Sequence, residues 1–185
     1  MGLERYVDVL LEAELFKGFD KDEILLMLKC LEPKVKEFDK GSHLAMAGEK
    51  FHGLGIMLEG EAAAYKENMA GTRVIMVILG PGDVFGEIVA FSTESQWPVT
   101  VEARQPSKAL FISQDKIVGE CRQACPWHRK LIENMLTMVS ERAIALSRKV
   151  EYLSIKSIRG KISTYLLEQY KRTGKTTFML PVNRN

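Results

Sequence analysis

Hydrophobic positions divide the chain into a helical opening, a run of short strands and a helical end. In residues 6–31 the apolar side chains recur at helical spacing, which predicts an N-terminal helical segment. Asp20 is a candidate N-cap because Glu23 follows three positions later, as in a capping box. Pro33 closes the segment, since proline cannot continue a helix.

Residues 34–112 follow a second pattern, in which apolar runs of strand length alternate with turn residues. Nine of the 14 glycines lie between Gly41 and Gly86, at intervals that suit tight turns between antiparallel strands. Many short strands with regular turns are typical of a sandwich or a closed roll. We therefore expect an antiparallel β-roll in this part of the chain.

From residue 115 onward the helical period returns, and its apolar positions recur alternately four and three residues apart. The repeat consists of Ile132, Leu136, Val139, Ala143, Leu146, Val150 and Leu153. A strict repeat of 3.5 residues is typical of a coiled coil, whereas a helix packed on a domain core has a wider stripe of period 3.6. The pattern favours a dimerisation helix over residues 126–154, with Pro126 in its first turn, and therefore a homodimer.

Residues 155–175 predict a second, shorter helix that stops at Thr173 and Gly174. The expected fold class is α+β: N-terminal helices, an antiparallel β-roll, a long coiled-coil helix and a short helix. No stretch approaches the roughly 20 uninterrupted apolar residues of a membrane span, so we expect no membrane partner.

The net charge of +2 conceals a division between the two parts of the chain. Residues 1–114 hold 12 basic and 18 acidic residues, whereas residues 115–185 hold 14 and 6. Such asymmetry indicates that the basic part meets a polyanion, most often nucleic acid. A solvated helix surface is the alternative interpretation.

Candidate catalytic and metal-binding residues are sparse. The three cysteines are too few for a disulfide framework, and a reducing cytoplasm is the default location. Cys121, Cys125 and His128 lie close together, but a fourth ligand is not evident and Pro126 interrupts the spacing. We expect no metal site, and because no catalytic triad, P-loop or paired acids emerge, we expect no enzyme.

The order of these parts resembles the CRP/FNR family of bacterial transcription regulators. The resemblance rests on "ILGPGDVFGEIVAF" (78–91), "SIRGKISTYLLE" (157–168) and "FMLPVNRN" (178–185), and it covers nearly the whole chain. It implies an effector-sensing domain like a cyclic nucleotide-binding domain at residues 1–125, a dimerisation helix at 126–154 and the start of a winged helix-turn-helix at 155–185. We expect a truncated sensor form or a longer natural chain, because the sequence stops before a recognition helix. The family implies a homodimer that binds two-fold-symmetric DNA under the control of a small effector.

The resemblance also assigns candidate effector-binding residues. They are Gly86, Glu87, Ile88, Trp97, Pro98, Val99, Arg142 and Leu146. Glu87 matches the family residue that hydrogen-bonds a ribose hydroxyl. Cyclic-nucleotide sensors carry arginine and then serine or threonine where this chain has Trp97 and Pro98, so a buried phosphate would lose its charged partner. Cyclic AMP is therefore not the expected effector.

These substitutions favour a mostly apolar pocket for an apolar or planar effector. Further candidates for the pocket lining are Met57, Met76, Met135 and Met138. Core filling is the more common role of methionine. Haem is the alternative effector, because some family members hold haem in this pocket and His, Met and Cys are its usual ligands. The rival function is a ligand-binding module with an output other than DNA binding.

Overall fold

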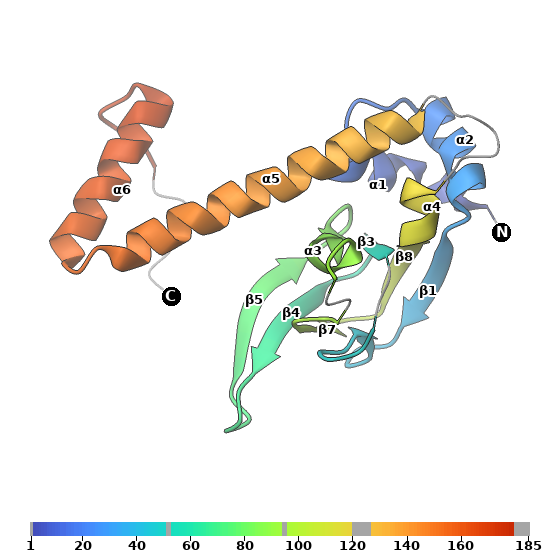
Figure 1. Cartoon of the computed structure of the whole chain (residues 1–185), viewed down its shortest axis with the longest axis horizontal. Coiled ribbons are helices and arrows are strands. Elements are labelled where there is room, and N and C mark those ends of the chain that lie inside the picture. The colour runs from blue at the N-terminus through green and yellow to red at the C-terminus, as the bar shows by residue number, and fades with distance from the viewer. Residues whose placement is uncertain (1, 51–52, 94–95, 120–126, 180–185) are drawn as a thin grey trace. The chain divides into compact units, whose positions relative to one another are not determined.

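A computed structural model describes residues 2–50, 53–93, 96–119 and 127–179 (Figure 1). The chain divides into two compact units, Met1–Val139 and Ser140–Asn185. The boundary falls inside the long helix α5, and the three-part division at residues 125 and 154 stays a prediction.

Short helices open the first unit. They are η1 (Leu3–Tyr6), α1 (Val7–Glu12), η2 (Glu14–Phe16) and α2 (Lys21–Leu31). The capping box predicted for α2 is confirmed: the Glu23 amide donates to Asp20 Oδ1 at 2.8 Å, and the Asp20 amide donates to Glu23 Oε2 at 3.0 Å. The helix ends at Glu32, whose left-handed backbone (φ 45°) turns the chain into the first strand.

Eight strands form two antiparallel sheets, which confirms the expected roll (Figure 1). The first sheet has the order β1-β8-β3-β6 and comprises β1 (Lys34–Phe38), β8 (Ser107–Ser113), β3 (Gly53–Glu59) and β6 (Val84–Phe85). The second sheet has the order β2-β7-β4-β5 and comprises β2 (His43–Ala45), β7 (Thr100–Ala103), β4 (Ala62–Glu67) and β5 (Arg73–Leu79). Two short helices, α3 (Glu87–Ala90) and α4 (Gln114–Val118), follow β6 and β8.

Strand β3 at the middle of the first sheet is buried on both faces because two separate cores adjoin it. Alternate residues of a strand point to opposite faces, so Leu54 and Ile56 of β3 reach one core while Met57 reaches the other. The first core joins this sheet to the N-terminal helices and includes Leu10, Phe16, Ile24, Met27, Leu31, Leu110 and Ile112. The second core joins the two sheets and includes Ala62, Ala64, Leu79, Phe85, Trp97, Val101 and Ala109.

Gly55 lies between two aromatic residues that adjoin the second core. It pairs with Phe85 of β6 on one side and with Phe111 of β8 on the other. The two phenyl rings meet edge to face, with their centroids 5.8 Å apart. A β-carbon on Gly55 would lie 2.1 Å from Phe85 Cζ, so only glycine leaves room for this pair of rings.

Helix α5 (Trp127–Ser154) begins in the first unit and contributes to its core. Leu131, Met135 and Met138 are buried in the first core, and the Asn134 side chain donates to the carbonyls of Leu15 (3.0 Å) and Lys17 (2.9 Å). Pro126, expected in the first turn of this helix, lies outside the described residues.

The second unit contains the rest of α5 and helix α6 (Ile158–Thr173). The Ser157 hydroxyl caps α6 by accepting from the Gly160 amide, and Gly174 ends it in the left-handed conformation (φ 66°), as the Thr173-Gly174 stop predicted. The Tyr152 hydroxyl donates to Glu168, and this hydrogen bond raises the pKa of Tyr152 to about 12. Among the described residues, no helix combines the length and apolar character needed to cross a membrane.

Replacing Gly55 with alanine should destabilise the first unit, because Phe85 would have to leave its place beside Phe111. Overpacking of this kind costs about 1–3 kcal/mol. Urea unfolding followed by circular dichroism measures the loss. The matched control is Gly80→Ala, where the new β-carbon meets only Asp83 Oδ2 at 3.9 Å and the stability should change by less than about 0.5 kcal/mol. Equal stabilities for the two variants would contradict this account of the core.

Candidate functional site

The expected effector cassette begins with a tight turn after β5. The Gly80 amide donates to Asp83 Oδ2 at 2.7 Å, and the Asp83 amide donates back to the Gly80 carbonyl at 3.0 Å. Gly82 has a φ of 88°, a left-handed conformation that favours glycine. The turn is also joined to β3, because the Gly82 amide donates to the Met57 carbonyl at 2.9 Å.

Gly86 and Glu87 follow β6 directly. Gly86 has a φ of 93° and immediately precedes α3. Glu87 is only 4 % exposed, although its neighbour Ile88 is exposed. A buried carboxylate is costly unless its charge is compensated, and carboxylates are rarely placed in a core for packing alone. The burial of Glu87 is therefore the feature of the cassette that packing explains least.

Trp97 is a core residue of the first unit. Its side chain is 5 % exposed, and its ring lies 6.0 Å from that of Phe85, with 35° between the ring planes. Its backbone is held as well, since its amide donates to the Glu49 carbonyl at 3.0 Å and its carbonyl accepts from Gly48 at 2.9 Å. Pro98 is exposed, and Val99 packs partly against the second core. Whether these three residues also line an effector pocket stays a prediction.

The four methionines considered for one apolar pocket do not gather in the structure. Met57 lies in the second core, whereas Met135 and Met138 lie in the first core, on the other face of the first sheet. Met76 is exposed on β5. The shared pocket lining is therefore wrong for these methionines, and core filling accounts for three of them.

Arg142 and Leu146 belong to the second unit. Arg142 is half-buried, and Leu146 is exposed. That these two side chains contact an effector bound at the cassette stays a prediction.

Helix α5 carries two apolar stripes. The stripe of Leu131, Met135 and Met138 is buried in the first core, and the sequence pattern did not single it out. The predicted seam lies on other positions: Ile132 is half-buried, whereas Leu136, Val139, Ala143, Leu146, Val150 and Leu153 are exposed. The buried stripe meets the need of the helix for core packing, and the predicted seam is separate from it.

Strand β5 adds a second exposed apolar surface. It lies at the edge of the second sheet, and five consecutive apolar side chains on it are exposed: Val74, Ile75, Met76, Val77 and Ile78. Successive side chains of a strand point to opposite faces, so both faces of β5 expose apolar groups, and exposed apolar patches are typical of contact sites. The sequence predicted the strand but not its exposure, because an apolar run reads the same in a buried strand.

The candidate metal clip cannot be placed. Cys121 and Cys125 lie outside the described residues, and His128 Nε2 contacts the Lys116 carbonyl at 3.2 Å. Within the described ranges no group of three His, Cys, Asp or Glu side chains is arranged to hold a metal ion.

Comparison with known proteins gives the class of the protein. Residues 35–124 match the cyclic nucleotide-binding domain family. The chain is 23 % identical over 167 residues to a CRP-like cAMP-activated global transcriptional regulator of Mycobacterium tuberculosis, covering 90 % of this chain and 71 % of the relative. It is 26 % identical over 137 residues to the cAMP-activated global transcriptional regulator CRP of Pasteurella multocida, covering 74 % of this chain and 64 % of the relative.

Solved structures agree on the fold. The catabolite activator protein of Thermus thermophilus superposes with a TM-score of 0.67 at 18 % identity, over 87 % of this chain and 72 % of its own. The sensor domain of the transcriptional regulator DNR from Pseudomonas aeruginosa superposes with a TM-score of 0.62 at 17 % identity, over 85 % of this chain and 99 % of its own.

Residues 35–124 therefore match a cyclic nucleotide-binding domain, and the fold of the chain is that of CRP-like neighbours. The resemblance expected from the sequence is confirmed, and so is the β-roll with N-terminal helices and a long following helix. The relatives named above are regulators, in agreement with the expectation that the chain is not an enzyme.

Substitutions within the cassette should show how much the Trp97 ring contributes to the stability of the first unit. Trp97→Ala should lower the free energy of unfolding by about 3–5 kcal/mol, because it empties a buried aromatic position beside Phe85. Ile88→Ala, at an exposed site in the same cassette, should change it by less than about 0.5 kcal/mol. Denaturant unfolding measures both values. A loss below about 1 kcal/mol for Trp97→Ala would show that the ring contributes little to the core.

Proposed function

We propose that the chain is the sensor and dimerisation part of an effector-responsive, DNA-binding transcription regulator of the CRP/FNR type. The observation that carries this proposal is the similarity to CRP-like regulators over 90 % of the chain, which extends past the sensor domain at residues 35–124 into the C-terminal helices. As a bacterial regulator of this kind it would act in the cytoplasm.

The proposed homodimer forms through the exposed seam of α5. The seam presents apolar side chains to solvent, and Leu153 is 75 % exposed. Its 3.5-residue repeat is the one that allows two helices to pack along their length. The exposed residues of β5 are a second apolar surface that a partner chain would cover, since large apolar patches are rare on monomers.

The proposed DNA contact belongs to the basic end of the chain. The described part of this end that follows α5 carries six basic residues against one acid, Glu168. The basic residues are Lys156, Arg159, Lys161, Lys171, Arg172 and Lys175. Helix α6 also exposes Ile158, Ile162, Leu166, Leu167 and Tyr170, an apolar face suited to the body of a further domain. We therefore assign residues 155–185 to the start of the DNA-binding part.

The effector that we propose for the cassette is apolar or planar and is not cyclic AMP. Trp97 occupies the position of the phosphate-binding arginine and is committed to the second core, while Pro98 has no amide N–H to offer. Glu87 would add negative charge near a phosphate. Haem remains the alternative effector.

The effector is tested directly on the protein purified from its own host. Native mass spectrometry would identify a co-purified small molecule by mass, and the optical spectrum would reveal haem by its Soret band. A bound organic molecule without that band supports the apolar effector. A bound cyclic nucleotide would overturn the proposal for the cassette.

Charge placed in the seam should separate the dimer. Val139→Asp or Val150→Asp would bury two like charges without partners, at a cost of about 3–5 kcal/mol and therefore a dimer about 100- to 4000-fold weaker. Sedimentation velocity measures the change. Ala145→Asp adds the same charge to an exposed position of α5 outside the repeat and should leave the dimer intact. Seam variants that remain dimeric would show that α5 is not the interface.

Cyclic AMP should bind about two to four orders of magnitude more weakly than it binds a relative with arginine and serine at the positions of Trp97 and Pro98. Each lost hydrogen bond to a charged group contributes about 1.5–3 kcal/mol, and about 1.4 kcal/mol corresponds to a factor of ten. Titration calorimetry with cyclic AMP and cyclic GMP measures the affinities. Micromolar affinity that disappears in Arg142→Ala would show instead that α5 binds the phosphate.

A further inference from the structure

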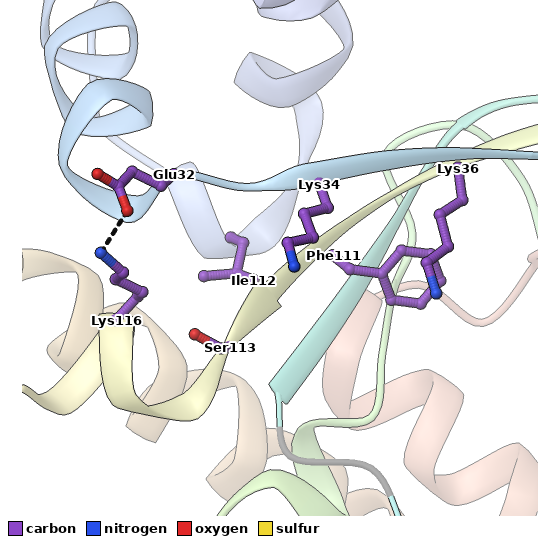
Figure 2. A pocket seen from close by; sticks show the side chains of 7 residues that line it. All are labelled: Glu32, Lys34, Lys36, Phe111, Ile112, Ser113 and Lys116. Carbon is purple, nitrogen blue, oxygen red and sulfur yellow. Dashed lines mark hydrogen bonds and ion pairs between the residues drawn. The ribbon is translucent and has the colours of Figure 1, made fainter.

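A cavity of about 440 Å³ opens on the first unit, at the end of the first sheet where β1 and β8 meet the end of α2 and the start of α4 (Figure 2). Its volume lies within the range of about 300–1,000 Å³ typical of small-molecule sites. Its lining includes Glu32, Lys34, Lys36, Phe111, Ser113 and Lys116. None of these residues belongs to the effector cassette.

The strand register places two of these lysines beside an aromatic ring. Lys34 pairs with Phe111 across the sheet, and Lys36 pairs with Ala109, so both lysines lie on the face of the sheet that carries the Phe111 ring. The close-up shows the side chains of Lys34 and Lys36 on the same side of β1 as this ring (Figure 2). Lys36 Nζ lies 5.3 Å from the centre of the ring.

The charges of the cavity are only partly balanced. Lys116 Nζ forms an ion pair with Glu32 Oε2 at 2.5 Å, which is the dashed contact in Figure 2. Among the residues that the structure describes, no carboxylate lies within ion-pair distance of Lys34 or Lys36. Two lysines without an ion pair to any described residue therefore stand at one cavity, in a part of the chain where acids outnumber bases by 18 to 12.

The aromatic wall restricts what can bind. Phe111 is half-buried, with one part of its ring in the second core beside Phe85 and another part lining the cavity. A flat apolar group can contact the part of the ring that lines the cavity, beside the Lys36 ammonium that lies over the ring, while acidic groups reach the two lysines. An inorganic anion would use the lysines alone. A long polyanion such as DNA would also meet the acidic surface of residues 1–114, where like charges repel it.

We propose that this cavity binds a small organic anion that carries two or more carboxylate or phosphate groups on a flat apolar body. Lys34 and Lys36 bind the acidic groups, the Phe111 ring packs against the apolar part, and the Ser113 hydroxyl is a further hydrogen-bonding group of the lining. The site is separate from the cassette, so the proposal holds whether or not the cassette binds the effector assigned to it above.

Titration calorimetry at low ionic strength tests the site, with benzene-1,3,5-tricarboxylate as the probe. The tricarboxylate should bind the unmodified chain, and the double variant Lys34→Met/Lys36→Met should weaken binding at least tenfold. The matched control is Lys66→Met, which removes an exposed lysine of β4 and should change the affinity less than twofold. Thermal unfolding of each variant verifies that the fold is retained, as expected for exposed lysines.

Citrate and inorganic phosphate form the comparison arms of the same titration. Citrate carries three carboxylates without a ring, so it should bind at least fivefold more weakly than the tricarboxylate, and phosphate more weakly still. Equal binding of all three anions would overturn the role of Phe111. Absence of tricarboxylate binding up to millimolar concentration, or equal binding by the double variant, would overturn the site itself.

Discussion

The packing of the second core depends on the contact between Phe85 and Phe111 across Gly55. This contact lies on the face of the first sheet that adjoins the second core, so a shift of either ring would disturb that core. Phe85 immediately precedes Gly86 and Glu87 of the cassette, and it also touches Trp97. Phe111 in turn lines the basic cavity. One set of packed rings therefore supports both candidate binding sites of the unit.

The same packing bears on the proposed difference between this cassette and that of a cyclic-nucleotide sensor. An arginine at position 97 would need a phosphate or a carboxylate to compensate for its burial, whereas a tryptophan there is stabilised by Phe85 and the surrounding apolar side chains. Glu87 is the polar residue that the cassette keeps buried. The aromatic core residue at position 97 is the feature behind our proposal that the effector lacks a phosphate.

Helix α5 carries two apolar stripes, of which one is buried in the first core and the other is exposed. Leu131, Met135 and Met138 attach the helix to the N-terminal helices, and Asn134 and Lys130 reinforce the attachment by donating to backbone carbonyls of residues 15–18. The seam that includes Leu136 and Val139 stays exposed. One helix therefore carries both the stripe that packs in the first core and the exposed seam that we propose for the dimer.

The sequence alone predicted the order of helical and strand regions and the ends of two helices, because these depend on local chemistry. Asp20 and Glu23 predict the start of α2, and Gly174 predicts the end of α6. The alternation of apolar runs with glycines predicts the roll. Only the tertiary structure decided which apolar residues are buried. Trp97 is a core residue and β5 is exposed because burial depends on which strands and helices cover a face, and periodicity along one element does not contain that information. Likewise, Lys116 is far from Lys34 and Lys36 in the sequence. The pairing of β1 with β8 brings the three lysines to one cavity.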